Sequence, residues 1–309
     1  MTTTDPVASL RFGPWVSPTT VNRTSAREVF VTDHARVGEE EFAIAARVAH
    51  DHPLWSDRRG HGHDPAVVVE AFRQAFVVVR HEYLGVPRGT PTAVQQLTLD
   101  VHDLSAFRTE GTTPLQGVIK VRVVRTGETL DIAGDFFIGP ARAMTLSFKG
   151  ILFSRDSYRG IREYQRSRRA VGTGGGPAGR PIEPELVGRR DRRNVVIGPA
   201  ARRNRFPLVV DRSHASFFDR DYDHVPGSLL IEAMRQSALR GAAEAGLCTG
   251  DASLIRAELD FGIFVETDTP ATCGVSVAGR PGAVTATVGI DQADVRAASG
   301  VLELTEGAS

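Results

Sequence analysis

The sequence predicts an α+β fold that is used twice along the chain. Two long apolar segments, Pro65 to about Gly85 and Gly227 to Gly246, are each followed by alternating strands. Both segments also carry a Glu, an Arg and a Gln at the same spacing within their apolar stretch. A long helix followed by antiparallel strands is an α+β unit in which the sheet covers the helix. A doubly wound parallel sheet is disfavoured, because its strands would alternate with helices.

Helix signals mark both ends of the first segment. Pro65 suits the first helical position and Gly85 suits a C-terminal stop. The valines Val67–Val69 and Val77–Val79 lower its helix propensity, so a strand is conceivable there. The length of the segment and its match to Gly227–Gly246, which has better helix formers, favour a helix that is buried on most sides.

Four strands are predicted after each helix, from their alternating apolar residues. Thr126-Gly127 is expected to form a two-residue hairpin connection, and Gly279–Gly282 a longer one. The predicted strands are Ala93–Val101, Leu115–Arg125, Glu128–Phe137 and Ala143–Phe153, and then Leu254–Val265, Ala271–Ala278, Ala283–Ile290 and Val295–Leu304.

The two halves superpose when the sequence is shifted against itself. An offset of 162 residues places Glu70 on Glu232, and a slightly larger offset aligns two upstream blocks. The other superposed positions are Arg73 and Arg235, Gln74 and Gln236, His52 and His214, Val21–Arg23 and Val187–Arg189, and Glu28–Val31 and Asn194–Ile197. Agreement over three separate blocks indicates an internal duplication.

A glycine-rich segment separates the halves. We therefore expect an N-terminal repeat over residues 1–165, a Gly/Arg-rich linker over 166–186 and a C-terminal repeat over 187–309. Two interpretations of the flanking arginines stay open: a solvated rim, or a basic patch that meets a phosphate or an acidic carrier protein. These arginines are Arg166, Arg168, Arg169, Arg189, Arg190, Arg192 and Arg193.

Composition narrows the class of protein. The 309 residues carry a formal net charge of zero, which gives no reason to expect a nucleic-acid or membrane partner. With only Cys248 and Cys273, and no basic-then-apolar N-terminal segment, a reduced cytoplasmic location is expected. No uninterrupted apolar run approaches the roughly 20 residues that cross a bilayer.

Charged residues inside an apolar helix need an explanation, because carboxylates and guanidiniums are rarely buried without partners. Burial disfavours the charged form of a Glu and would raise its pKa towards that of a useful base. Glu232 and Arg235 share a helix face, so Arg235 can keep Glu232 ionised or bind a phosphate. The alternative is a purely structural ion pair, which need not stabilise the fold.

The motif Pro226–Met234 resembles the central-helix signature of hotdog-fold enzymes, among them the β-hydroxyacyl-carrier-protein dehydratases. From about Val21 to Glu303 the chain is more similar to the A-factor biosynthesis family, the γ-butyrolactone synthases of actinomycetes. The closest parts are Asp223–Gly227, Arg193–Ile197 and the two Glu-x-x-Arg-Gln motifs. The resemblance implies a tandem (double) hotdog fold, each repeat a long central helix wrapped by an antiparallel sheet.

The resemblance also implies a reaction. Family members are acyltransferases that join a β-ketoacyl thioester, carried by a carrier protein or coenzyme A, to dihydroxyacetone phosphate. The ester then leads to a γ-butyrolactone, butenolide or furan hormone that controls antibiotic production. No cofactor and no metal are implied. The residues expected to be catalytic are Glu70, Glu232 and Arg235, and those expected to bind substrate are Arg73, Gln74, His224 and Gln236.

Other functions stay open at this point. A hotdog dehydratase or thioesterase would act on the same thioesters, but His214 lies further from the helix than the dehydratase pattern requires. A non-catalytic acyl-binding protein would gain little from buried carboxylates. His61, His63 and Asp64 form a cluster that can ligate a metal, although a loop without further ligands is more often solvated.

Overall fold

The computed structural model describes residues 6–60, 62–108, 112–169, 179–200 and 202–306. The chain divides into two compact units, each described here by itself. The first unit consists of Met1–Ser56, His61–Ala93 and Leu99–Phe153. The second unit consists of Asp57–Gly60, Val94–Thr98 and Ser154–Ser309. In the part of the chain that the structure describes, the helices are too short or too polar to span a bilayer.

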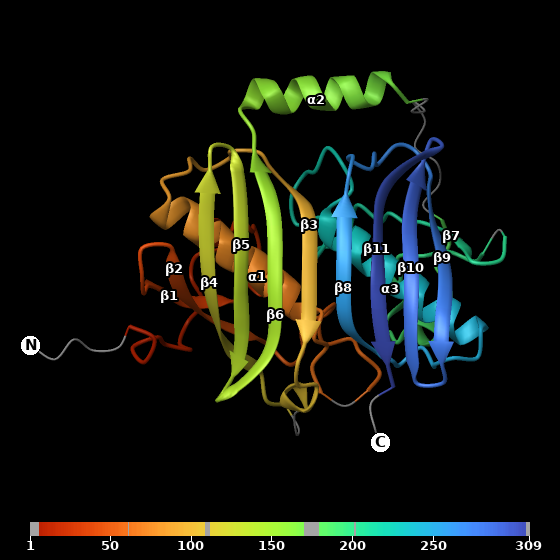
Figure 1. Ribbon diagram of the computed structural model, residues 1–309, viewed down its shortest axis with the longest axis horizontal. Coiled ribbons are helices and arrows are strands. Elements are labelled where there is room, and N and C mark those ends of the chain that lie inside the picture. Colours follow the sequence, from red (N-terminus) through yellow and green to blue (C-terminus); the bar gives the residue numbers. More distant parts are fainter. Residues whose placement is uncertain (1–5, 61, 109–111, 170–178, 201, 307–309) are drawn as a thin grey trace, which may run out of the picture. The chain divides into compact units, whose positions relative to one another are not determined.

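The first unit is an antiparallel sheet with one long helix against it (Figure 1). Neighbouring strands follow the order β1-β2-β4-β5-β6. Buried and exposed residues alternate along β4, as expected for a sheet with one face on the core. The strands are β1 (Val31–Arg36), β2 (Glu41–Val48), β4 (Leu115–Thr126), β5 (Thr129–Ile138) and β6 (Ala141–Leu152), and β3 (Thr92–Val101) has residues in both units.

Helix α1 (Val67–Val78) forms the core of the first unit, and every one of its residues except Arg73 is buried. It continues as a short π-helix, η3 (Val79–Tyr83), and the chain then turns at Gly85 with a positive φ of 64°. The ring of Phe72 packs edge-on against Phe148 of β6 at 4.9 Å. The predicted helix is therefore confirmed, and it begins two residues later than Pro65.

The second unit repeats this plan. Its strands follow the order β8-β11-β10-β9-β7, and helix α3 (Gly227–Glu244) packs on β9, β10 and β11. The strands are β7 (Arg205–Pro207), β8 (Ser253–Phe261), β9 (Ala271–Arg280), β10 (Ala283–Gln292) and β11 (Val295–Thr305). A further helix, α2 (Arg155–Ser167), belongs to this unit and begins at Ser154, whose side chain accepts from the Ser157 N–H.

The segments that precede each central helix are also duplicated. In both units two short 3-10 helices are separated by a residue with positive φ, Asn22 at 57° and Gly188 at 70°. Ser25 and Asp191 cap the second 3-10 helix of each pair through their side chains. The pairs are η1 (Pro18–Val21) with η5 (Pro184–Val187), and η2 (Ala26–Glu28) with η6 (Arg192–Asn194). The internal repeat therefore extends to the backbone conformation of the loops.

All eight predicted strands are present, but four strands and α-helices were not predicted and two turns differ from the prediction. The unpredicted elements are strands β1, β2 and β7 and helix α2, which is polar along most of its length and gives no apolar run. The β4–β5 turn consists of Gly127 and Glu128, one residue later than expected. The β9–β10 turn is not a longer loop but the two residues Pro281 and Gly282, because Arg280 already pairs with Ala283.

The fold predicts a steric limit at Gly134 in β5. A Cβ atom there would collide with the carbonyl oxygen of Lys120 and lie 3.0 Å from the Phe72 ring. Gly134→Ala should therefore destabilise the protein by about 1–3 kcal/mol in urea unfolding, the usual cost of overpacking. Gly160→Ala is the control, since nothing lies within 4 Å of that position in helix α2 and alanine favours helix. Equal stability of the two variants would contradict this packing.

Candidate functional site

Glu70 in helix α1 is buried together with two arginines. Its Oε1 atom accepts hydrogen bonds from Arg23 Nε at 3.2 Å and from Arg73 Nη2 at 2.8 Å, and Arg23 Nη2 lies 2.8 Å away. Oε2 accepts from Arg73 Nε at 2.8 Å. Gln74 Nε2 donates to Oε1 at 2.7 Å. The carboxylate thus holds two guanidiniums and an amide in fixed positions.

Glu232 in helix α3 has the same surroundings in the second unit. Oε1 accepts from Arg189 Nε at 3.1 Å and from Arg235 Nη2 at 2.8 Å, and Oε2 accepts from Arg235 Nε at 2.9 Å. Arg189 Nη2 lies 2.8 Å from Oε1. Gln236 Nε2 donates to Oε1 at 2.5 Å. We call these two groups the Glu70 cluster and the Glu232 cluster.

The two glutamines also tie each helix to the loop before it. Gln74 accepts from the Phe30 N–H at 2.8 Å and donates to the Glu28 carbonyl at 2.7 Å. Gln236 accepts from the Val196 N–H at 2.9 Å and donates to the Asn194 carbonyl at 2.7 Å. A buried amide that satisfies main-chain groups fixes the loop against the helix. These hydrogen bonds hold the loops that carry Arg23 and Arg189 against the helices that carry Glu70 and Glu232.

The arginines Arg23 and Arg189 were missing from the predicted site. Both lie in loops that are far from the helices in sequence, and the side chain of Arg189 is fully buried. The signal was present in the sequence, because the upstream offset superposes these two residues. A buried, duplicated arginine requires a buried, duplicated carboxylate as partner.

Electrostatics in the Glu70 cluster differ from the expectation of a raised pKa. Burial alone would raise the pKa of Glu70, but the positive charges of Arg23 and Arg73 and the hydrogen bonds outweigh it and lower the pKa to about 2. Glu70 therefore remains an ionised carboxylate at neutral pH. The expectation of a proton acceptor tuned upwards by burial is wrong for this residue, since its partners are cations.

The clusters differ in exposure and in their neighbours. The side chain of Arg73 is 28% exposed, whereas that of Arg235 is 5% exposed. Next to the first cluster, His52 Nε2 lies 3.4 Å from the buried carboxylate of Glu28. The second cluster has the neutral Asn194 at that position, which accepts from His214 Nε2 at 2.9 Å. Asn194 Nδ2 in turn donates to the buried carboxylate of Asp57 at 2.7 Å, so a different residue supplies the negative charge there.

His224 lies just before helix α3 and is held by a carboxylate and a phenol. Its Nδ1 atom is 2.6 Å from Asp223 Oδ1, and the Tyr158 hydroxyl donates to the same carboxylate at 2.9 Å. The hydrogen bond from His224 keeps the pKa of Asp223 far below its usual range. Burial and the charge of Asp223 raise the pKa of Tyr158, which therefore stays protonated. A carboxylate on one ring nitrogen fixes the tautomer and leaves the other nitrogen able to accept a proton.

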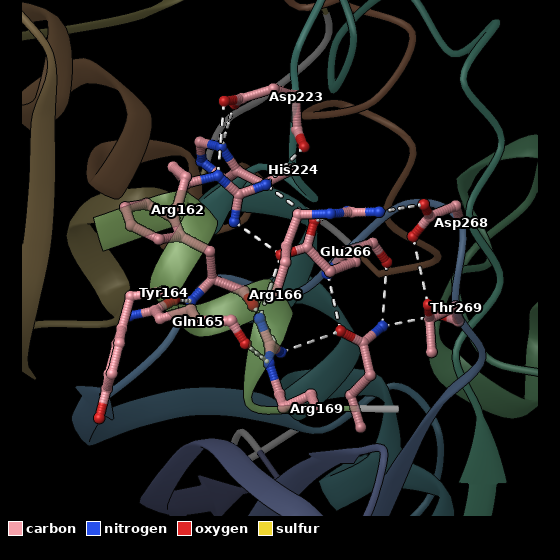
Figure 2. A network of polar contacts seen from close by, with 12 residues as sticks. Arg162, Tyr164, Gln165, Arg166, Arg169, Asp223, His224, Glu266, Asp268 and Thr269 are labelled. Carbon is pink, nitrogen blue, oxygen red and sulfur yellow. Dashed lines mark hydrogen bonds and ion pairs between the residues drawn. The ribbon is translucent and has the colours of Figure 1, made fainter. Parts of the chain in front are cut away.

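Helix α2 is anchored by three arginines on one buried carboxylate, Glu266 (Figure 2). Arg162, Arg166 and Arg169 approach its oxygens at 2.7, 2.5 and 3.1 Å. Arg162 Nη2 also donates to the Asp223 carbonyl at 2.8 Å. The anchor therefore extends to the segment that carries His224.

Several of the arginines that flank the linker form internal ion pairs and are not available for a basic patch. Arg166, Arg169 and Arg189 bind Glu266 or Glu232, and only some flanking arginines, such as Arg168 and Arg190, are exposed. The linker residues 170–178 lie outside the described residues. An exposed basic surface beside the linker could therefore use only the flanking arginines that lack such internal ion pairs.

The alternative of a metal site at His61, His63 and Asp64 finds no support among the described residues, which contain no group of three or more side chains that could hold a metal ion. His61 lies outside the described part of the chain. His63 Nε2 contacts the Thr113 carbonyl at 3.1 Å. Asp64 accepts from the Ala66 N–H at 3.0 Å, just before α1 begins.

The sequence of this chain is similar to those of known enzymes. The sequence is 29% identical over 265 residues to a 2-oxo-3-(phosphooxy)propyl 3-oxoalkanoate synthase of Streptomyces coelicolor, covering 85% of this chain and 81% of the relative. A Streptomyces griseus protein of the same name is also 29% identical, over 85% of both chains. These relatives are synthases, which confirms the prediction of an enzyme of the transferase class.

Solved structures agree on the fold. An oleoyl thioesterase from Lactobacillus plantarum is similar at a TM-score of 0.53 and 12% identity, covering 87% of this chain and 97% of its own. A thioesterase from Novosphingobium aromaticivorans is similar at 0.50 and 13%, covering 89% and 98%. The predicted tandem hotdog fold is confirmed. Because residues 5–139 and 175–305 match the A-factor biosynthesis hotdog domain, the chain belongs to the A-factor biosynthesis hotdog family.

Proposed function

We propose that this protein transfers a β-ketoacyl group from a thioester to the free hydroxyl of dihydroxyacetone phosphate. The product would be the phosphorylated ester that leads to a γ-butyrolactone, butenolide or furan hormone controlling antibiotic production. The observation that carries the proposal is the similarity, along most of the chain, to relatives whose name describes this ester. The acyl donor would be a β-ketoacyl carrier protein or β-ketoacyl coenzyme A.

The reaction defines what the site must supply. The acceptor oxygen forms a bond to the thioester carbonyl carbon, the carbon–sulfur bond breaks, and the hydroxyl proton finally leaves with the thiol. A negative charge develops on the carbonyl oxygen between these two events. The site therefore needs a proton acceptor, donors for the oxyanion and a binding site for the phosphate.

The Glu232 cluster is suited to the oxyanion. Arg189 and Arg235 carry two positive charges against the single negative charge of Glu232, so the cluster has one positive charge in excess. Guanidiniums fixed in a buried environment stabilise a developing negative charge without having to reorient. We assign Arg235 to the oxyanion and Glu232 to the positioning of both guanidiniums.

The Glu70 cluster is proposed to act through Arg73. Glu70 is a weak base at a pKa of about 2, but it fixes a guanidinium that is 28% exposed. A partly exposed, rigid arginine is suited to bind an anionic group of the substrate. Gln74 and Gln236 then contribute to substrate binding indirectly, by holding the loops.

His224 is the proposed proton acceptor. Its Nδ1 atom faces Asp223 at 2.6 Å, the arrangement in which a carboxylate leaves the second imidazole nitrogen to act as a base. The segment of Asp223 and His224 leads directly into α3, which carries Glu232. A protonated imidazole cannot accept a proton, so the reaction should slow in acid.

The reaction itself is the first test. Purified protein with a β-ketoacyl thioester and dihydroxyacetone phosphate should yield the phosphorylated ester by mass spectrometry, together with one equivalent of free thiol. Formation of the ester should require dihydroxyacetone phosphate. Thiol release at the same rate without dihydroxyacetone phosphate would identify a thioesterase, loss of water a dehydratase, and tight acyl binding without turnover a binding protein.

The roles of Glu232 and His224 separate in the pH–rate profile. Glu232→Gln should lower kcat by about 10²–10³, the cost of disturbing oxyanion donors, and keep the acid limb of the profile. His224→Asn should lower kcat by about 10²–10⁴ and abolish that limb. Glu244→Gln, on the same helix and paired with Arg240 at 2.8 Å, is the control with an unchanged profile. Loss of the acid limb in Glu232→Gln would instead make Glu232 the base.

Acid should weaken the Glu70 cluster. The pKa of Glu70 is lowered from 4.5 to about 2, so its ion pairs stabilise the fold above pH 4.5, and this stabilisation is lost as the pH falls towards 2. The difference in unfolding free energy between wild type and Glu70→Gln should therefore be largest at neutral pH and shrink on acidification. Glu82→Gln, at an exposed pair with Arg88, should show a small difference at every pH. A constant difference for Glu70→Gln would contradict the lowered pKa.

A further inference from the structure

A surface pocket of about 400 Å³ in the second unit is lined mainly by arginines. Its walls are Arg59, Arg189, Arg190, Pro184 and Glu185. Three cations line the pocket with one anion, and one of these cations, Arg189, is already paired with Glu232. The volume lies at the small end of the range for ligand sites, about 300–1,000 Å³. The pocket therefore suits a small anion rather than an acyl chain.

The main chain brings these arginines together. Arg58 and Arg189 form an isolated antiparallel bridge, and the Arg59 N–H donates to the Gly188 carbonyl at 3.2 Å. Gly188 has a φ of 70°, and a Cβ atom there would collide with the Gly250 carbonyl, so this position requires glycine. Two adjacent arginines on each of two paired segments are thereby held at one place.

Arg189 joins the pocket to the Glu232 cluster. It is one of the residues that line the pocket, and its guanidinium lies 2.8 Å from Glu232 Oε1. The pocket is therefore adjacent to the cluster assigned to the oxyanion. A ligand bound there would place its remaining atoms near the reacting groups.

The two other cations are available for a ligand. Among the residues that the structure describes, none pairs with the guanidinium of Arg190, whose backbone N–H donates to Asp57. Arg59 faces Asp251 at 3.7 Å, and both side chains are 46% exposed. Such an exposed pair contributes little and is easily exchanged for another anion.

The positions that the repeat offsets pair with these pocket residues lack this charge. The offsets pair Arg59 with Asp221, Arg189 with Arg23, Arg190 with Thr24, Pro184 with Pro18 and Glu185 with Thr19. The counterparts carry one positive and one negative charge, a net charge of zero. The positive charge of the pocket residues is therefore not repeated at their counterpart positions.

We propose that this pocket is the binding site for the phosphate group of the acceptor substrate, held by Arg59 and Arg190. The inference rests on the proposed function for the identity of the phosphorylated compound. A phosphate monoester carries about −1.5 to −2 charges at neutral pH, which the guanidiniums of Arg59 and Arg190 can balance. Guanidiniums bind phosphate oxygens with two parallel hydrogen bonds.

Binding of inorganic phosphate tests the site independently of the reaction. The full chain should bind phosphate in phosphorus NMR or calorimetric titrations, with weaker binding at high ionic strength. Arg190→Ala, and the double variant with Arg59→Ala, should weaken binding roughly 10- to 100-fold. Arg280→Ala, an exposed arginine of the same unit, is the matched control and should leave it unchanged. Circular dichroism and thermal melting verify that each variant is folded.

The kinetic readout is the KM for dihydroxyacetone phosphate, which should rise by a similar factor in both variants while kcat at saturation changes little. No saturable phosphate binding to the wild type, or unchanged binding and KM in the folded double variant, would overturn the proposal. Phosphate binding that depends on Arg59 and Arg190 supports the site even if no ester forms, in which case only the proposed function fails.

Discussion

The buried carboxylate that binds two guanidiniums is the interaction on which both halves of this protein depend. Glu70 and Glu232 each join an arginine of their own helix to an arginine of a distant loop, and the neighbouring glutamine ties that loop to the helix through its main chain. Buried ions of this kind contribute little net stability, but removing one partner leaves an uncompensated charge. The cluster therefore constrains the loop, the helix and the arginines together.

This constraint changes the chemistry that such a carboxylate can perform. A Glu surrounded by apolar residues is a stronger base, whereas Glu70 among its guanidiniums is a weaker one. The useful groups of the cluster are then the fixed arginines. Proton transfer is better assigned to His224, whose partner Asp223 also contacts Tyr158 and Arg162 of helix α2. A helix anchored through Glu266 thus positions the segment at the start of α3.

Duplication makes the differences between the repeats informative. The polar groups are matched, since each buried glutamate meets two arginines and one glutamine. Departures from the repeat are then the places to look for requirements beyond the fold, such as Arg190 for Thr24. Arg190 adds a positive charge in the pocket where we place the phosphate. The first repeat instead exposes part of Arg73.

The sequence by itself determined the α+β class, the internal repeat, both central helices and eight strands, because apolar periodicity and self-similarity are local properties. It also identified the Glu, Arg and Gln on one face of each helix. Strands β1, β2 and β7 and helix α2 were not predicted, since polar contacts to distant residues stabilise α2 and no local pattern records them. Only the tertiary structure decided that Arg23 and Arg189 complete the clusters, and hence that Glu70 is a weak base. The charge of a buried group depends on which distant side chains surround it.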